Sequence, residues 1–145
     1  MILFTIGFTR KSAERFFTLL KEAQVRRVLD VRLNNRSQLA GFSKATDLEY
    51  FLRAIGGMEY RHLSELAPTQ ELLDTYKKRR GSWSEYERGF VELLQKRGVD
   101  QSLDRSLFDM ACLLCTEHEP LHCHRRLVAE YLKDRWRDVD VRHLL

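Results

Sequence analysis

The stretch Met110-Ala-Cys-Leu-Leu-Cys-Thr-Glu-His-Glu-Pro-Leu-His-Cys-His-Arg-Arg126 carries the strongest indications of both fold and site. Residues 110–115 form a short apolar run that predicts a buried strand. The following loop holds two carboxylates, three imidazoles and a thiol, and a helix headed by two arginines begins near Cys123. Reactive side chains between the carboxyl end of a strand and the amino end of a helix are typical of a functional site.

Strand and helix patterns alternate along the rest of the chain. Apolar runs predict strands at 2–6, 28–31, 58–63 and 110–115, and an alternating pattern predicts a final edge strand at 139–143. Helical spacing predicts helices after Ser12, near Thr46, at 69–80, after Ser82, at 102–108 and from about Cys123. This order predicts a single α/β domain over 1–145, with a mostly parallel sheet of about five strands and helices on both faces.

Local signals mark where several helices begin and end. Ser12 can cap the first helix. The stretches Thr46-Asp-Leu-Glu49 and Ser82-Trp-Ser-Glu85 match the capping box, in which a hydroxyl binds the first helical turn. The pair Gly56-Gly57 predicts the end of the helix that follows Thr46.

The composition is that of an ordinary globular domain. Of 145 residues, 43% are hydrophobic and 32% are charged. The net charge of +4 permits an anionic partner without requiring one. No apolar run approaches the roughly 20 residues that span a bilayer, and no signal peptide opens the sequence, so we expect no membrane partner. Three cysteines without framework spacing favour a reducing, cytoplasmic location. The oligomeric state is left open.

Polar residues follow four of the predicted strands. In open parallel sheets, ligands bind outside the carboxyl ends of the strands, so these segments are expected to share one rim. The residues expected there are Thr9, Arg10, Asp30, Arg32, Asn34, Asn35, Arg36, His62, Glu65, Cys115, Glu117, His118, His122, Cys123 and His124.

Four short motifs resemble the signature of a known family. They are Asp30-Val-Arg32, Asn34-Asn-Arg-Ser-Gln-Leu-Ala-Gly-Phe42, Leu114-Cys-Thr-Glu117 and Cys123-His-Arg125. Together they resemble the domain of unknown function 488, over the whole chain, although Asn35 and Ala40 stand where much of that family has proline. The resemblance implies a fold and a site but no settled activity. The residues that it implies for one functional rim are Asp30, Arg32, Arg36, Cys115, Glu117, Cys123, His124 and Arg125.

Cys123 is the first candidate nucleophile. Near a helix amino terminus and flanked by histidines and arginines, its thiol is expected to have a lowered pKa, and His124 could transfer the proton. The alternative is a half-buried thiol that only packs there. Cys115, at the end of its strand, can reach the rim, whereas Cys112 points to the opposite face and is expected to be an inert core residue.

Glu117 and Asp30 are the candidate acid and base. A carboxylate shielded from water can act as a general base. The alternative is a structural ion pair, either Asp30 with Arg32 or Glu117 with Arg125, that supports the loops.

The arginines of the rim favour an anionic ligand. Arg10, Arg32, Arg36 and Arg125, together with a helix amino terminus, predict binding of a phosphate-bearing molecule. Asn34 could contact a base or sugar, and Cys115 and His122 are further ligand-binding candidates. Some of these arginines could instead cover the outside of the sheet.

A zinc site and a cofactor are not predicted. Cys115, His118, His122 and Cys123 offer suitable atoms. However, His122 and Cys123 are adjacent, and adjacent side chains rarely face the same ion.

These features favour an enzyme acting on a phosphate-containing substrate, a nucleic acid or a nucleotide, but turnover itself is left open. One alternative is a non-catalytic nucleic-acid-binding or regulatory module, for which the basic run Lys77-Lys-Arg-Arg80 and nearby Trp83 could supply contacts. Another is a thiol redox sensor, in which Cys123 would join Cys115.

Overall fold

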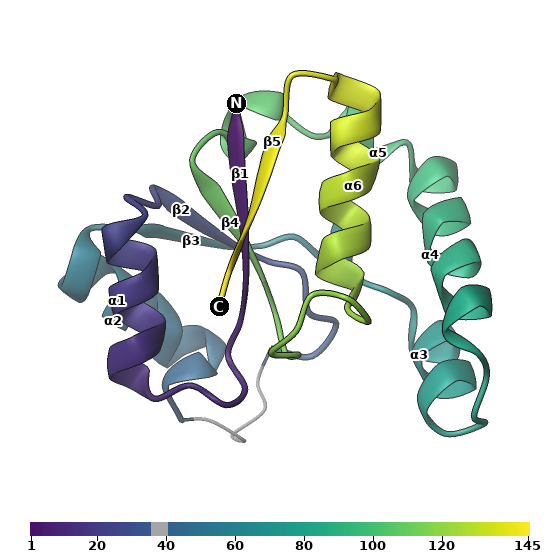
Figure 1. Cartoon of the computed structure of the whole chain (residues 1–145), viewed down its shortest axis with the longest axis horizontal. Helices are drawn as coiled ribbons and strands as arrows, with labels where there is room; N and C mark the ends of the chain where they lie inside the picture. Colours follow the sequence, from purple (N-terminus) through teal and green to yellow (C-terminus); the bar gives the residue numbers. More distant parts are fainter. Residues whose placement is uncertain (36–40) are drawn as a thin grey trace.

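Every strand pair among the described residues is parallel, in agreement with the predicted mostly parallel sheet. The computed structural model describes residues 1–35 and 41–145, and within them five strands form one sheet in the order β3-β2-β4-β1-β5 (Figure 1). The final strand lies at an edge, beside β1, which confirms the predicted α/β fold. The strands are β1 (Ile2–Gly7), β2 (Arg27–Asp30), β3 (Glu59–His62), β4 (Ala111–Cys115) and β5 (Asp140–Leu144).

Helices cover both faces of this sheet (Figure 1). One face carries α1 (Ala13–Glu22) and α2 (Ala45–Gly56), and the other carries α6 (His124–Trp136) with α4 (Trp83–Arg97) beyond it. Helix α3 (Gln70–Lys77) packs on α4, and the short α5 (Val99–Ser102) lies against α6. Short 3-10 turns lie at Gly41–Ser43 (η1), Ser64–Leu66 (η2) and Arg105–Phe108 (η3).

Strand β4 separates two hydrophobic cores because its side chains alternate between the faces. Cys112 and Leu114 belong to the core under α1 and α2, together with Phe16. Leu113 and Cys115 belong to the core under α4 and α6. The prediction that Cys112 and Cys115 point to opposite faces is therefore confirmed.

The strand register aligns the carboxyl ends of four strands at one edge of the sheet. Gly7 pairs with Cys115, and Asp30 pairs with both Leu114 and His62. Segments that leave β1, β2, β3 and β4 therefore start at the same edge of the sheet, where the sequence places the candidate residues.

The helix starts agree with the sequence at two of three places. Ser12 Oγ accepts a hydrogen bond from the Arg15 N–H at 3.0 Å, and Ser82 Oγ accepts one from Glu85 at 3.1 Å. The capping role predicted for Thr46 is wrong, because α2 begins at Ala45 and Thr46 already lies inside the helix. Lys44 is the N-cap residue, and no side chain of the described residues caps this helix. Gly57, with φ +62°, ends it as predicted.

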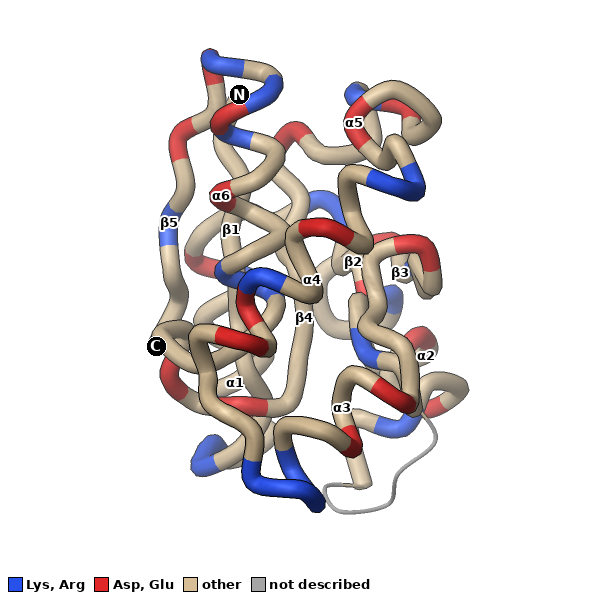
Figure 2. The backbone as a smooth tube through the Cα atoms, turned by 90° about the vertical axis from the view of Figure 1, so that its right-hand side faces the viewer, with Lys and Arg blue, Asp and Glu red and all other residues tan. Residues whose placement is uncertain are grey.

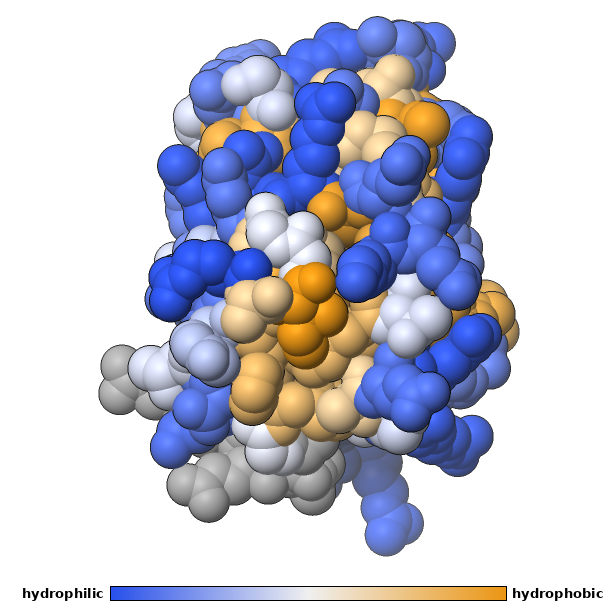
Figure 3. All heavy atoms as spheres, turned by 90° about the vertical axis from the view of Figure 1, so that its left-hand side faces the viewer, coloured by the Kyte–Doolittle hydropathy of each residue, from blue (hydrophilic) through white to orange (hydrophobic). Residues whose placement is uncertain are grey.

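The outer surface of α1 and α2 carries an apolar patch (Figure 3). A hollow of about 370 Å³ lies there, lined in part by Phe17, Phe42, Phe51 and Ile55. Among the described helices, none has the length and apolar character needed to cross a membrane.

Candidate thiol–imidazole site

The segments that leave β2, β3 and β4 are joined by hydrogen bonds at the rim. The His124 Nε2–H donates to the Val31 carbonyl at 2.7 Å, and the His62 Nε2–H donates to the Arg32 carbonyl, also at 2.7 Å. The segment that follows β2 is thus held between the end of β3 and the start of α6. The loops that the sequence assigns to one rim do meet there.

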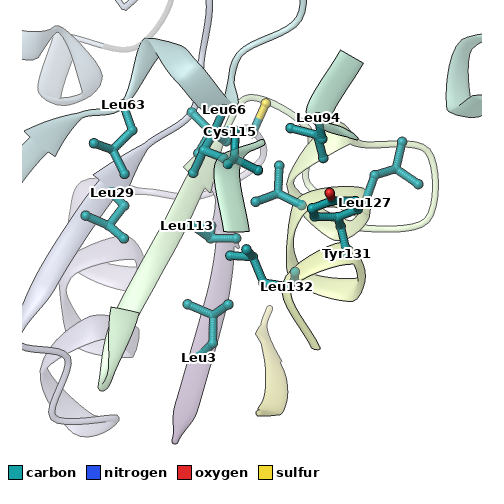
Figure 4. Packing of buried hydrophobic residues seen from close by; sticks show 14 of the residues in the cluster. Leu3, Leu29, Leu63, Leu66, Leu94, Leu113, Cys115, Leu127, Tyr131 and Leu132 are labelled. Atoms are coloured by element: carbon teal, nitrogen blue, oxygen red, sulfur yellow. The ribbon is translucent and has the colours of Figure 1, made fainter. Parts of the chain in front are cut away.

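Cys115, Cys123 and His124 form a compact buried cluster. Their sulfur and ring-nitrogen atoms lie within 4.8 Å of one another. Cys115 Sγ lies 3.4 Å from His124 Nδ1. In Figure 4 the sulfur of Cys115 lies at the end of the hydrophobic cluster, beyond Leu113. The three side chains are 2–7% exposed, so the cluster is shielded from solvent.

The backbone at the start of α6 explains why adjacent residues converge on Cys115. Cys123 is the N-cap residue and has an extended conformation, with φ −134° and ψ 137°, whereas His124 is the first helical residue. The change of backbone direction between them turns both side chains toward the end of β4. An argument from sequence adjacency alone misses this turn.

The two thiols of the cluster differ in acidity. Burial alone would raise the pKa of Cys115, but hydrogen bonds from the Cys123 thiol and the Thr116 N–H, with the charge of Arg125, lower it below its usual value. The lowered pKa predicted for Cys123 is wrong, because burial raises the pKa of this thiol and its interaction with Cys115 adds to this effect. These surroundings favour Cys115 over Cys123 as the reactive sulfur.

His124 is held as a neutral ring. Burial lowers the pKa of its imidazole. Because a carbonyl oxygen only accepts hydrogen bonds, the proton of the neutral ring is assigned to Nε2, which faces Val31. Nδ1 is then the acceptor nitrogen, and the Cys115 sulfur lies 3.4 Å from Nδ1 and 3.6 Å from Nε2.

A small hollow of about 80 Å³ opens onto the cluster. His122, which is exposed, stacks on Trp83 with ring centroids 4.9 Å apart. The Glu117 carboxylate is about half exposed and pairs with Lys77 at 3.4 Å. Lys and Arg residues that follow α3 gather at this end of the molecule (Figure 2). The hollow is lined by Leu73, Tyr76, Lys77, Trp83, Tyr86, Cys115, Glu117, His122, Cys123 and His124.

Asp30 and Arg32 form a buried ion pair. Arg32 Nε and Nη2 donate to the two carboxylate oxygens at 2.9 and 2.8 Å, and the Tyr60 hydroxyl donates to the same carboxylate at 2.6 Å. Arg32 Nη2 also donates to the Ser43 carbonyl, and Nη1 has no partner among the described residues. This bidentate geometry favours the alternative role of Asp30, a structural ion pair with Arg32, over the role of a general base.

Arg125 is fully buried and binds the backbone. Its Nη1 and Nη2 donate to the carbonyls of Glu117 and His118 at 2.6 and 3.0 Å. It therefore contacts the Glu117 carbonyl instead of its carboxylate. A Cβ atom at Gly7 would lie 1.6 Å from the same carbonyl oxygen, so this loop can close over β1 only where residue 7 has no side chain.

Two of the predicted ligand-binding residues, Arg10 and Asn34, are not among the residues that line the hollow at the cluster. Arg10 is exposed, with φ +58°, and no ion pair or hydrogen bond joins it to another residue of the described segments. Asn34 is exposed. Arg36 lies outside the described residues.

A second hollow, of about 550 Å³, lies on the other side of the segment that follows β2. It is lined by Asn35, Lys44, Ala45, Thr46 and His62, at the amino terminus of α2. The sequence reasoning missed Lys44 and Tyr60 as parts of this region. The spacing of Tyr60, two residues before His62 on a predicted strand, is the signal that places both on one face.

The fold and the rim define an α/β domain with a buried dithiol–imidazole cluster at the carboxyl ends of its strands. The chain belongs to the family described as Domain of unknown function DUF488, whose model matches residues 12–132. Comparisons with curated proteins and with solved structures gave no match.

Proposed function

We propose that this chain is an enzyme that uses Cys115 as a nucleophile on a phosphate-containing substrate, a nucleotide or a nucleic acid. The observation that carries the proposal is the contact of Cys115 Sγ with His124 Nδ1 at 3.4 Å, with His124 oriented by the Val31 carbonyl. A nucleophile, a base and a group that orients the base are the parts of a covalent catalytic site.

The cluster suggests a simple division of roles. His124 Nδ1 accepts the proton of the Cys115 thiol, and the thiolate attacks the electrophilic centre of the substrate. The bond between that centre and its leaving group breaks, and the protonated imidazole gives its proton to the leaving group. A water molecule, deprotonated by His124, then attacks the covalent intermediate, breaks its bond to sulfur and frees Cys115 for the next turnover. The Cys123 sulfur lies within 4.8 Å of the Cys115 sulfur and lowers the pKa of that thiol.

The phosphate part of the proposal rests on the charge around the two hollows. Lys77 lines the smaller hollow, where it pairs with Glu117, and Lys44 lines the larger one. The N–H groups of the first turn of α2 add partial positive charge to the larger hollow. The stacked His122 and Trp83 rings offer an aromatic platform of the kind that accepts a nucleobase.

Turnover measurements test the proposal. The protein, kept reduced and free of metal, is incubated with nucleoside mono-, di- and triphosphates and with single-stranded oligonucleotides, and products are separated by chromatography. We expect turnover that falls at least about a thousandfold in Cys115→Ser and His124→Gln and persists in Cys112→Ser. Binding of the substrate should remain in Cys115→Ser and weaken in Lys44→Ala.

Two results would contradict the proposal that the chain is an enzyme. Binding without turnover in the wild type would mean that the chain is a binding module. Turnover that is unchanged in Cys115→Ser would remove the thiol from the chemistry.

A redox sensor is the second candidate, because the Cys115 and Cys123 sulfur atoms are close enough to interact. Peroxide oxidises one thiolate to a sulfenic acid, and the second thiol displaces water to form a disulfide. A sensor would lose two free thiols under mild peroxide, and dithiothreitol would restore both. Cys123→Ala would then form no disulfide, whereas Cys112→Ala would behave as the wild type.

A further inference from the structure

We infer that Cys115, Cys123 and His124 also form a binding site for a thiophilic divalent cation, for which Zn²⁺ is the best fit. The inference concerns the regulation of the same site. Its consequence for activity rests on the enzymatic function proposed above. A cation on the two sulfur atoms occupies the nucleophile, so the metal-loaded protein is the inactive form.

The first argument is the geometry of the ligand atoms. In tetrahedral zinc sites, metal–sulfur distances of about 2.3 Å and metal–nitrogen distances of about 2.0 Å place ligand atoms roughly 3.5–3.8 Å from one another. Cys115 Sγ and His124 Nδ1 are 3.4 Å apart, and all three ligand atoms lie within 4.8 Å. Small side-chain rotations therefore suffice to surround an ion.

The second argument is the orientation of the imidazole. A histidine that binds a metal usually donates its other ring N–H to a carbonyl or carboxylate, which fixes the ring and its tautomer. The His124 Nε2–H donates to the Val31 carbonyl at 2.7 Å, and this leaves Nδ1 without a proton, 3.4 Å from the sulfur of Cys115. The same sulfur lies 3.6 Å from Nε2, so a rotation of the thiol is needed to bring an ion onto the Nδ1 lone pair. The hydrogen bond that would orient the imidazole toward an ion is therefore already formed.

The third argument concerns the fourth coordination position. Within the described residues, the groups of cysteine, histidine and carboxylate side chains close enough to hold an ion comprise only Cys115, Cys123 and His124. All three line the small hollow. A water molecule or a substrate group can therefore complete the tetrahedron from the hollow, as in zinc sites with three protein ligands.

The ligand set differs from the one considered from sequence. His118 Nδ1 lies 3.0 Å from the Lys11 ammonium, and His122 stacks on Trp83. Neither belongs to the group of close ligand atoms. Of the four ligands considered from the sequence, only Cys115 and Cys123 belong to the cluster. The third ligand in the structure is His124.

Cobalt provides a direct test, since its thiolate complexes absorb in the near ultraviolet and its tetrahedral complexes absorb in the visible. The reduced, metal-free protein is titrated with Co²⁺, and Zn²⁺ is then added with a chromophoric chelator as competitor. We expect one cation per chain, both absorption features, and displacement of Co²⁺ by Zn²⁺. Cys123→Ala should weaken Zn²⁺ binding at least about a hundredfold.

Two matched variants control for the ligand set. Cys112→Ala removes the third thiol of the chain, and His122→Gln removes the neighbouring imidazole. Both should bind as the wild type does, with folding of every variant checked by circular dichroism. Absence of thiolate–cobalt absorption in the wild type would overturn the inference. So would binding that Cys123→Ala leaves unchanged or that Cys112→Ala weakens equally.

A second measurement separates this inference from the proposed function. Zn²⁺ should slow the alkylation of Cys115 by iodoacetamide at least about tenfold in the wild type, and excess chelator should restore the rate. Cobalt binding without any turnover of the metal-free protein would overturn the proposed enzyme and support the metal site. Turnover in chelator without cobalt binding would overturn the metal site alone.

Discussion

The two faces of β4 give the same residue type two different environments. Cys112 and Cys115 lie three residues apart on one strand, and both are buried. Cys112 faces the core under α1 and α2, where burial raises the pKa of its thiol. Cys115 lies at the end of the other core, against Cys123 and His124. Position at the carboxyl end of the strand, more than burial, therefore decides which thiol meets polar groups.

Alkylation rates should show the largest difference between these two thiols. We expect iodoacetamide to modify Cys115 at least about a hundredfold faster than Cys112, because the thiolate is the reactive form and Cys115 lines a hollow. Peptide mass spectrometry of the metal-free protein at successive times measures both rates in one sample.

The control for this comparison is His124→Gln, which removes the base beside one thiol only. It should slow the modification of Cys115 and leave the rate at Cys112 unchanged. Equal rates for the two thiols in the wild type would mean that the two faces do not differ as described.

A second comparison concerns Arg27, the first residue of β2, and Arg32, which follows the end of that strand. Arg32 pairs with Asp30 in the interior, whereas Arg27 pairs with Glu59 at the surface. Arg32→Met should lower the free energy of unfolding by about 3–5 kcal/mol, because it leaves the Asp30 carboxylate buried without its partner. Arg27→Met should have a smaller effect, because the Glu59 carboxylate that loses its partner is exposed to water, although the hydrogen bond from Arg27 Nη1 to the Leu107 carbonyl is lost as well. Urea unfolding of both variants measures the difference.

The double variant Asp30→Asn/Arg32→Met sharpens this result. It removes both charges, so it should be more stable than Arg32→Met alone. If Arg32→Met and Arg27→Met lose the same stability, the buried pair is not a structural support of the rim.

Much of the fold could be predicted from the sequence. Apolar runs and helical spacing predicted the parallel sheet, and Cys115, Cys123 and His124 were among the many residues predicted for its rim. The partners could not be predicted, because they depend on tertiary contacts. Arg125 turns inward to two carbonyls only because Gly7 lets the loop close over β1. A sequence pattern does not show whether an arginine faces an anion or the backbone.

The same limit explains the start of α2. A hydroxyl residue three positions before a glutamate occurs at Thr46 and at Ser82, yet only Ser82 is a cap. The turn η1 at Gly41–Ser43 delivers the chain to Lys44 in an extended conformation, so the helix begins before Thr46 is reached. The local pattern therefore does not decide whether a hydroxyl residue caps a helix, and at α2 the preceding turn decides it.

Alanine substitutions at these two positions provide the smallest of the expected effects. Ser82→Ala, on the face of the thiol site, should lower the free energy of unfolding by about 1 kcal/mol, because the Glu85 N–H loses its acceptor. Thr46→Ala, on the opposite face, should stay within about 0.5 kcal/mol of the wild type, because alanine is a better helix former and no cap is lost. Thermal unfolding monitored by circular dichroism measures both. A loss at Thr46 as large as that at Ser82 would place the cap of α2 at Thr46 in solution, and the two helix starts would then follow the same rule.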